Sequence, residues 1–241
     1  MHSLWCRRLA CSLGRAGETP APQCLQPQGA GLYYSGMKNT ATVTSAESLA
    51  RLKAGHERFL HGRFEHPHCD LDRRKSVFAD GQHPFAAVIS CSDSRVPVEL
   101  IFDQGIGDLF VVRVAGNVCN GDEIASIEYA VEHLGAPLCV ILGHTRCGAV
   151  TTVVSRSPLD GHLAQLMRKI NDAADDARRE NLALAGDGLV DAAARHNVQR
   201  GMAELMRESF LIAAHVNSGA LEIAGAVYDL ATGQIEWLAH V

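Results

Sequence analysis

Residues 138–148 read LCVILGHTRCG, five apolar residues followed by a glycine and then by a histidine and a cysteine three positions apart. Residues 85–95 read FAAVISCSDSR, a second apolar run that leads into Cys91 and a polar loop. Short apolar runs bounded by glycine or polar residues are typical of buried strands. A third run, Leu109–Val114, lies between these two. These runs predict neighbouring strands of a buried, mostly parallel sheet.

Segments with helical spacing separate the expected strands. Glu123–Leu134 carries apolar residues on one helical face, and two longer amphipathic segments follow at Gly161–Arg179 and Leu189–Arg207, before a short one at Ser209–Val216. Residues 220–238 predict a strand or hairpin at the sheet edge. The expected fold is therefore α/β: a mostly parallel central sheet flanked by helices, with an antiparallel edge strand at the C-terminus.

An N-terminal helical arm is expected at Ser45–Leu60, because Thr44 and Glu47 have the spacing of a capping box. Residues 1–40 differ in composition from the rest, being rich in Gly, Pro and Gln, with arginines against the single acid Glu18. We expect this extension to be disordered. It is either a transit segment or, if Met37 is the natural start, an extension of the reading frame, and the sequence does not choose between these.

Composition excludes some classes of function. The 241 residues suit one domain of about 41–241, and the net charge of −5 with no Lys/Arg run argues against nucleic-acid binding. No apolar run approaches the roughly 20 residues of a membrane span. The eight cysteines favour a reducing compartment over a disulfide framework, because the chain has enough apolar residues for a core. We expect a cytoplasmic protein, or a mitochondrial one if residues 1–36 are a transit peptide.

Chemically capable side chains follow two of the expected strands. Cys91 comes after the run at 85–89, and His144 and Cys147 come after the run at 138–142. The carboxyl ends of parallel strands are where ligands collect in open α/β sheets. Two thiolates and one imidazole can hold zinc and leave a fourth position for water. From the residues alone, a metal site and ordinary buried cysteines are equally supported.

Asp93 and Arg95 lie two positions apart on the loop beside Cys91. Arg95 can keep Asp93 ionised, and Asp93 can then accept a hydrogen bond from a reacting water. The same pair is also consistent with a structural ion pair that holds a loop.

The two segments together resemble the signature motifs of the β-class carbonic anhydrases. Residues 91–97 (CSDSRVP) and 143–148 (GHTRCG) carry the resemblance, which continues through 108–117, 126–131 and 225–238 and covers about residues 45–240. It implies a carbonate dehydratase, a zinc-dependent carbon–oxygen lyase that hydrates CO2 reversibly to bicarbonate and a proton through zinc-bound hydroxide. It also implies one Zn²⁺ per chain on Cys91, His144 and Cys147, with Asp93 and Arg95 as the catalytic dyad.

The resemblance further implies a CO2 pocket shaped partly across a dimer interface. By position, Gln82, Phe110 and Tyr129 match pocket residues of the family, and the backbone at Gly148 can approach the substrate closely because no Cβ intrudes. A homodimer or homotetramer is expected, with the N-terminal helix reaching over the neighbouring subunit. Some members have a closed state in which the residue matching Asp93 takes the fourth metal position, and the same state is expected here.

Three other functions remain open at the level of sequence. A hydrolase of carbonyl sulfide or carbon disulfide would need nearly the same metal site. A non-catalytic zinc protein is disfavoured because a structural site has no use for the Asp93–Arg95 pair. A redox protein is disfavoured because Cys91 and Cys147 belong to no Cys-x-x-Cys arrangement.

Overall fold

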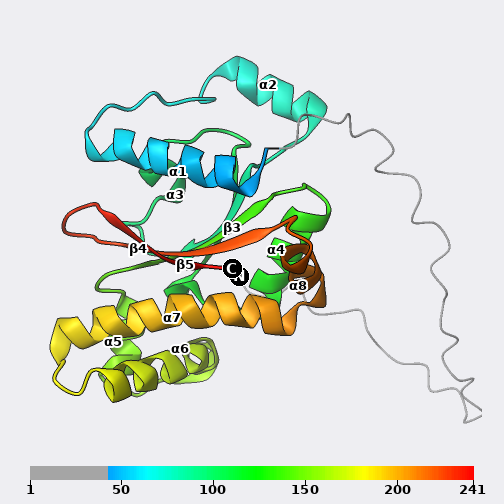
Figure 1. Cartoon of the computed structure of the whole chain (residues 1–241). Helices are drawn as coiled ribbons and strands as arrows, with labels where there is room; N and C mark the ends of the chain where they lie inside the picture. The colour runs from blue at the N-terminus through cyan, green and yellow to red at the C-terminus, as the bar shows by residue number, and fades with distance from the viewer. Residues whose placement is uncertain (1–42) are drawn as a thin grey trace, which may run out of the picture. The chain divides into compact units, whose positions relative to one another are not determined.

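The computed structural model describes residues 43–241, so the expectations for residues 1–40 lie outside the described part. Its centre is a five-stranded sheet in the order β2-β1-β3-β4-β5 (Figure 1). The strands are β1 (Ala86–Cys91), β2 (Leu109–Val114), β3 (Leu138–His144), β4 (Glu222–Tyr228) and β5 (Ile235–His240). All neighbouring pairs are parallel except β4 with β5. The expected fold class is confirmed, including the antiparallel C-terminal edge strand.

Helices cover both faces of the sheet, as Figure 1 shows. They are α1 (Ser45–Leu60), α2 (Leu71–Asp80), α3 (Val98–Ile101), α4 (Gly121–Glu132), α5 (Gly148–Val154), α6 (Gly161–Glu180), α7 (Gly186–Glu208) and α8 (Phe210–Asn217), with a 3-10 turn η1 at Ala115–Asn117. Side chains of α1 and α3 pack on one face, whereas those of α4, α7 and α8 pack on the other. The expected helices are therefore present, with ends that differ by a few residues.

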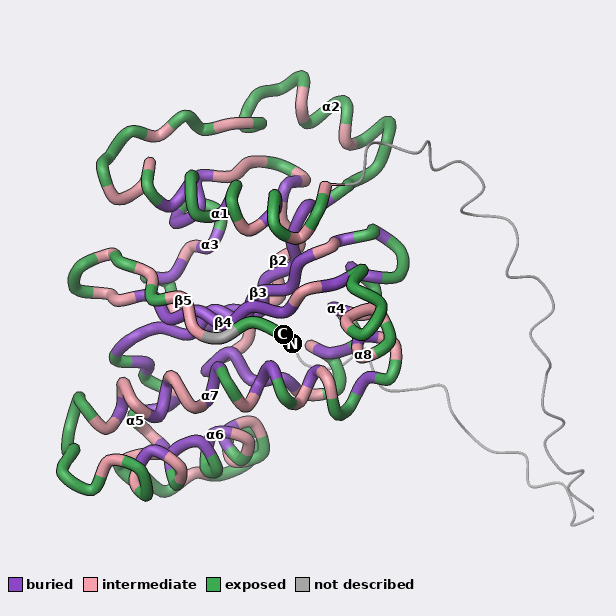
Figure 2. The backbone as a smooth tube through the Cα atoms, viewed as in Figure 1, coloured by how far each residue is buried: buried purple, intermediate pink, exposed green. Residues whose placement is uncertain are grey.

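Two apolar layers form because successive strand side chains point to opposite faces. On β3, Val140 and Leu142 face the layer under α1, while Ile141 faces the layer under α7. All seven β3 residues are buried, and Figure 2 shows the central strands as the most continuously buried part of the chain. Burying one large aliphatic side chain contributes about 1.5–3 kcal/mol, so this double-sided sheet stabilises the fold strongly.

The N-terminal helix begins where its sequence predicts. Thr44 Oγ1 accepts from the Glu47 N–H at 3.2 Å, and a Glu47 carboxylate oxygen accepts from the Thr44 N–H at 2.8 Å. The helix packs against its own chain through Leu52, which is fully buried. Its reach over a neighbouring subunit stays a prediction.

Helix α7 lies unusually close to the sheet at Gly143. A Cβ on Gly143 would stand 2.6 Å from Cγ2 of Val198, so only glycine permits this approach. Gly143 directly precedes His144, and α7 therefore runs beside the end of β3 that bears the histidine. Within the described range, no helix is both long enough and apolar enough to cross a membrane.

Candidate metal centre

The two segments that carry the candidate metal ligands meet at the carboxyl ends of β1 and β3. These strands are parallel neighbours, with Ser90 in register with Leu142. Cys91 is the last residue of β1, His144 is the last of β3, and Cys147 is the N-cap of α5. Strand pairing thus brings Cys91 close to His144 and Cys147, which lie 53 and 56 positions later in the sequence.

Three donor atoms converge there. In the described part of the chain, Cys91, His144 and Cys147 form the one group of three candidate ligands, with donor atoms all within 4.8 Å of one another. The two Sγ atoms are 4.0 Å apart. Two thiolates at 2.3 Å from one tetrahedral ion would be about 3.8 Å apart, so the spacing suits zinc.

The imidazole of His144 is oriented for metal binding. Its Nδ1 lies 2.9 Å from the carbonyl oxygen of Thr145, which can only accept, so Nδ1 carries the hydrogen. Its Nε2, with the free lone pair, is buried and has no hydrogen-bond partner within residues 43–241. A buried polar atom without a partner is destabilising, and a bound metal ion would supply the missing partner. The donor set therefore fits zinc.

The backbone around Thr145 is tied to the sheet edge. The Thr145 N–H donates to the carbonyl of Tyr228 at 2.9 Å, and Thr145 Oγ1 accepts from the Leu230 N–H at 3.0 Å. These bonds hold the segment between the two ligands against β4. Thr145 therefore fixes His144 twice, through the backbone and through the Nδ1 contact.

The carboxylate of Asp93 is held firmly by Arg95. The Arg95 backbone N–H and Nε each donate to Oδ1 at 2.9 Å, and Nη2 donates to Oδ2 at 2.7 Å. These bonds to the Arg95 side chain hold the pKa of Asp93 far below its ordinary value. Asp93 is therefore an anion throughout the physiological range, and in this structure it is held by Arg95. The closed state, with Asp93 on the metal, stays a prediction.

Arg113 supports the same loop from β2. Its Nε donates to the Cys91 carbonyl at 3.1 Å, and its Nη2 donates to the Asp93 carbonyl at 2.7 Å. Sequence reasoning missed this residue. The only available signal was a lone arginine in an apolar strand, and its reach depends on the β1–β2 register.

The pKa values of the two thiols are shifted in opposite directions. The Cys147 thiol hydrogen-bonds to Cys91, and this bond, together with the one from the Gly116 N–H, lowers the pKa of Cys91. The pKa of Cys147 is raised, because its proton is shared with Cys91 and because it is buried. One thiolate is thus already favoured, and a divalent cation would stabilise the second.

The expected pocket residues lie elsewhere. Gln82 is exposed on the connection before β1, and Tyr129 is 40% exposed on α4. Phe110 is half-buried on β2, with its ring centre 6.0 Å from that of Tyr129. In register, Phe110 pairs with Ala87, whereas Cys91 pairs with Val114. Four strand positions separate these pairs, about 13 Å.

Gly148 is the exception, since it directly follows Cys147. It is exposed, and no described heavy atom lies within 4 Å of the point where a Cβ would stand. Of the predicted site residues, the structure therefore brings together Cys91, Asp93, Arg95, His144, Cys147 and Gly148. It places Gln82 and Phe110 at the opposite end of the strands, and Tyr129 beside Phe110.

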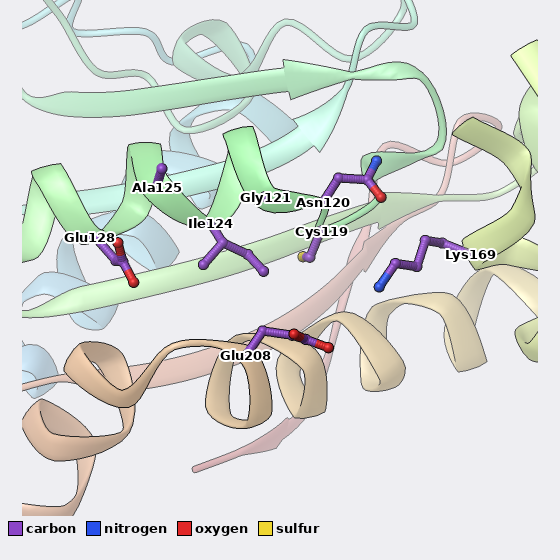
Figure 3. A pocket seen from close by; sticks show the side chains of 8 residues that line it. All are labelled: Cys119, Asn120, Gly121, Ile124, Ala125, Glu128, Lys169 and Glu208. Carbon is purple, nitrogen blue, oxygen red and sulfur yellow. The ribbon is translucent and has the colours of Figure 1, made fainter. Parts of the chain in front are cut away.

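A separate cavity of about 360 Å³ lies beside α4 and contains none of the predicted site residues (Figure 3). It is lined by Cys119, Asn120, Gly121, Ile124, Ala125, Glu128, Lys169 and Glu208. Its charged groups have partners within the chain: Lys169 pairs with Glu204, and Glu128 accepts from Ser209. This cavity is therefore a weaker candidate for a catalytic or metal site than the Cys–His–Cys group.

Comparisons with known proteins point to one family. A family model described as carbonic anhydrase matches residues 86–235. Carbonic anhydrase 2 of Mycobacterium tuberculosis is 37% identical over 209 residues, covering 85% of this chain and 97% of the relative. The carbonic anhydrase of Mycolicibacterium smegmatis is 38% identical over 211 residues, with the same coverage.

Solved structures agree with this. A tetrameric β-carbonic anhydrase of Sordaria macrospora matches with a TM-score of 0.65 and 27% identity, over 81% of this chain and 96% of that one. The β-carbonic anhydrase CafA of Aspergillus fumigatus matches with a TM-score of 0.63 and 31% identity, over 80% and 89%. The sheet and its helices are therefore shared with proteins of known activity.

Proposed function

The chain belongs to the β-carbonic anhydrase family, and from this premise we propose that it uses zinc to hydrate CO2 reversibly to bicarbonate and a proton. One observation carries the proposal. The buried, unpartnered Nε2 of His144 lies within 4.8 Å of two thiol sulfurs and 3.9 Å from Oδ2 of Asp93. A metal-binding group and an ionised carboxylate thus share one small volume.

Cys91, His144 and Cys147 would hold the zinc ion, one per chain. When bound, zinc supplies a Lewis acid that makes water nucleophilic near neutral pH. Three protein ligands leave one position open, as a catalytic site requires. A fourth His, Cys, Asp or Glu donor would close it, and none joins this group within residues 43–241.

Asp93 would orient the reacting water. Its carboxylate accepts hydrogen bonds, and Arg95 keeps it ionised and fixed by three donors. Arg113 holds the backbone carbonyls on either side of this loop, at Cys91 and Asp93. These hydrogen bonds would fix the loop and with it the direction of the Asp93 carboxylate. A fixed carboxylate is needed to orient a small reactant.

The CO2 pocket would be completed by a second copy of the chain. Phe110 and Gln82 lie too far along the strands to reach the metal group of their own chain. Strand β2 is an edge strand whose apolar residues are only partly buried. A two-fold axis beside β2 reverses the strand direction and brings Phe110 of one copy toward the Cys91 end of the other. Homodimer formation, with or without pairing to a tetramer, would thus build the apolar wall.

One purified sample tests the proposal. Zinc content is measured by elemental analysis, and CO2 hydration by stopped flow, beside an Asp93→Ala variant. We expect one zinc per chain, fast hydration, and retained zinc with a slower rate in Asp93→Ala. Zinc without hydration at any pH would reject the CO2 reaction and favour a structural metal or another small electrophile, such as carbonyl sulfide. No zinc at all would reject the metal centre.

A further inference from the structure

Helix α7 hydrogen-bonds to the turn between His144 and Cys147, and also to the 3-10 turn η1, whose Gly116 contacts Cys91. Oδ1 of Asp191 accepts a hydrogen bond from the backbone N–H of Arg146 at 2.8 Å. Six residues later, Nδ2 of Asn197 donates to the carbonyl of Gly116 at 2.8 Å. These are long-range contacts, 45 and 81 residues apart in sequence.

The contact of Asp191 falls on a strained residue. Arg146 lies between His144 and Cys147 and has a φ of +51°, in the left-handed region that side-chain-bearing residues disfavour. This conformation turns the chain sharply and so sets the directions of His144 and Cys147. A conformation of this kind persists only where neighbouring groups hold it.

Asp191 is well placed to hold this turn. A carboxylate is a stronger acceptor for a backbone N–H than a neutral oxygen. The Arg146 side chain has a different partner, since its Nη2 lies 2.9 Å from Oδ2 of Asp187, with both side chains about two-thirds exposed. Exposed pairs of this kind contribute little. Asp187 therefore pairs with the side chain of Arg146, whereas Asp191 bonds to its backbone.

The contact of Asn197 fixes α7 against η1, which in turn contacts the third candidate ligand, Cys91. Gly116 donates its N–H to Sγ of Cys91 at 3.3 Å, and Asn197 holds the carbonyl of the same residue. Asn197 is buried, and its neighbour Val198 packs fully buried toward Gly143. The helix is thus anchored independently of Asp191, so it is a rigid support for the turn.

We propose that Asp191 is a positioning residue of the metal centre, which holds the left-handed turn at Arg146 so that His144 and Cys147 point at one ion. This rests on the proposed function, since it requires a metal at this group. Asp191 hydrogen-bonds to the backbone of Arg146 and not to a ligand atom. Its effect is therefore on geometry, and metal affinity and ligand-field spectra report it directly.

The test compares four proteins with the wild type: Asp191→Ala, Asp191→Asn, the matched control Asp187→Ala, and the double variant Asp191→Ala/Arg146→Gly. Zinc affinity is measured by competition with a chromophoric chelator. The visible spectrum of the cobalt(II)-loaded proteins reports the ligand geometry. Loss of outer groups that support ligands typically weakens metal affinity about 10- to 100-fold.

We expect Asp191→Ala to lose zinc affinity in that range and to shift the cobalt(II) absorption bands. Asp191→Asn should show smaller changes in both. Asp187→Ala should have the zinc affinity and the spectrum of the wild type. Glycine adopts a positive φ without strain, so Arg146→Gly should restore the affinity and spectrum of Asp191→Ala. Wild-type affinity and spectrum in both Asp191 variants would overturn the proposal. So would a loss that Arg146→Gly does not reduce. If the wild type itself binds neither zinc nor cobalt, the proposed function fails instead.

Discussion

Oδ2 of Asp93 lies 3.9 Å from Nε2 of His144, an atom that is buried and without a partner in the described part of the chain. The carboxylate is thus beside the metal group but bound to Arg95. The same carboxylate would have two uses, orienting a reactant while held and approaching the metal if released. Because Arg95 holds the carboxylate, a change at Arg95 tests both uses.

Replacing Arg95 tests this role. Arg95→Ala removes the two side-chain donors to Asp93, so we expect CO2 hydration about 10- to 100-fold slower with zinc retained. Arg95→Lys keeps the charge but loses the two-point contact, and should lie between Ala and wild type. Stopped-flow rates and zinc content are measured together. The exposed pair Lys75–Asp72 offers a control, Lys75→Ala, which should leave the rate unchanged. A wild-type rate in Arg95→Ala would show that the pair only holds the loop.

The shared pocket predicts complementation between two defective chains. One chain carries Cys91→Ala and the other Gln82→Ala/Phe110→Ala, and each alone should be nearly inactive. In a mixed dimer, one site combines intact metal ligands from the second chain with intact pocket residues from the first. With random pairing in co-expression, about a quarter of all sites are restored. If pocket and metal belonged to one chain, no activity would return.

The fold was largely predictable because its signals are local. Apolar runs bounded by glycine or polar residues mark β1, β2 and β3, and Thr44 with Glu47 marks the start of α1. Helix α2 was not predicted, since none of its residues is buried and no apolar stripe marks it. Helix α5 was not predicted either, because its seven residues are too short for a period and are rich in β-branched residues.

The site was predictable only where chemistry sits in short motifs. Cys91, Asp93, Arg95, His144 and Cys147 follow two strands that the sequence marks clearly. The supporting groups come from elsewhere: Arg113 reaches the loop through strand register, and Asp191 reaches Arg146 across 45 residues. No local pattern encodes such a distance. The proposed shared pocket was expected only from the family resemblance, because no local pattern tells which end of β2 would meet a second copy.

Cysteine alkylation should separate three environments. Cys69 is exposed and should react with iodoacetamide in the native protein. Cys139 should not, since it is fully buried and burial raises its pKa to about 12, and Cys119 is also buried with a raised pKa. Cys91, whose pKa is lowered, should be protected by zinc and become reactive after chelation.

Peptide mass spectrometry measures each site, with Cys69 as the internal control for reagent and time. Equal labelling of Cys91 before and after chelation would contradict a metal on this sulfur. Labelling of Cys139 in the native protein would contradict its burial.

The close approach of α7 to the sheet predicts an intolerant glycine. Gly143→Ala places a methyl 2.6 Å from Cγ2 of Val198, and overpacking of this kind lowers the free energy of unfolding by about 1–3 kcal/mol. Gly121→Ala is the matched control, because no described heavy atom lies within 4 Å of its Cβ position. Urea unfolding measures both. Adding Val198→Ala should recover part of the loss in Gly143→Ala, and an unchanged midpoint in Gly143→Ala would refute the close contact.

His56 predicts a loss of stability as the pH falls. It is buried on α1, its Nδ1 lies 3.2 Å from the Ile101 carbonyl, and its ring packs against those of Phe59 and Phe102. Burial lowers its pKa below the ordinary value of 6.5. Below pH 6.5 the unfolded chain therefore binds a proton that the folded chain excludes, so acid favours unfolding. The slope from this one group is at most about 1.4 kcal/mol per pH unit.

Unfolding free energies between pH 8 and pH 5 measure this effect in wild type, His56→Gln and His61→Gln. His61 is the exposed C-cap residue of the same helix, so His61→Gln is the control for removing a histidine from this helix. His56→Gln should be less stable at pH 8, since it loses ring packing, but should lose less on acidification. Its curve should therefore approach the wild-type curve as the pH falls. Parallel curves for His56→Gln and wild type would mean that another group controls the acid sensitivity, and that α1 stays docked when His56 is protonated.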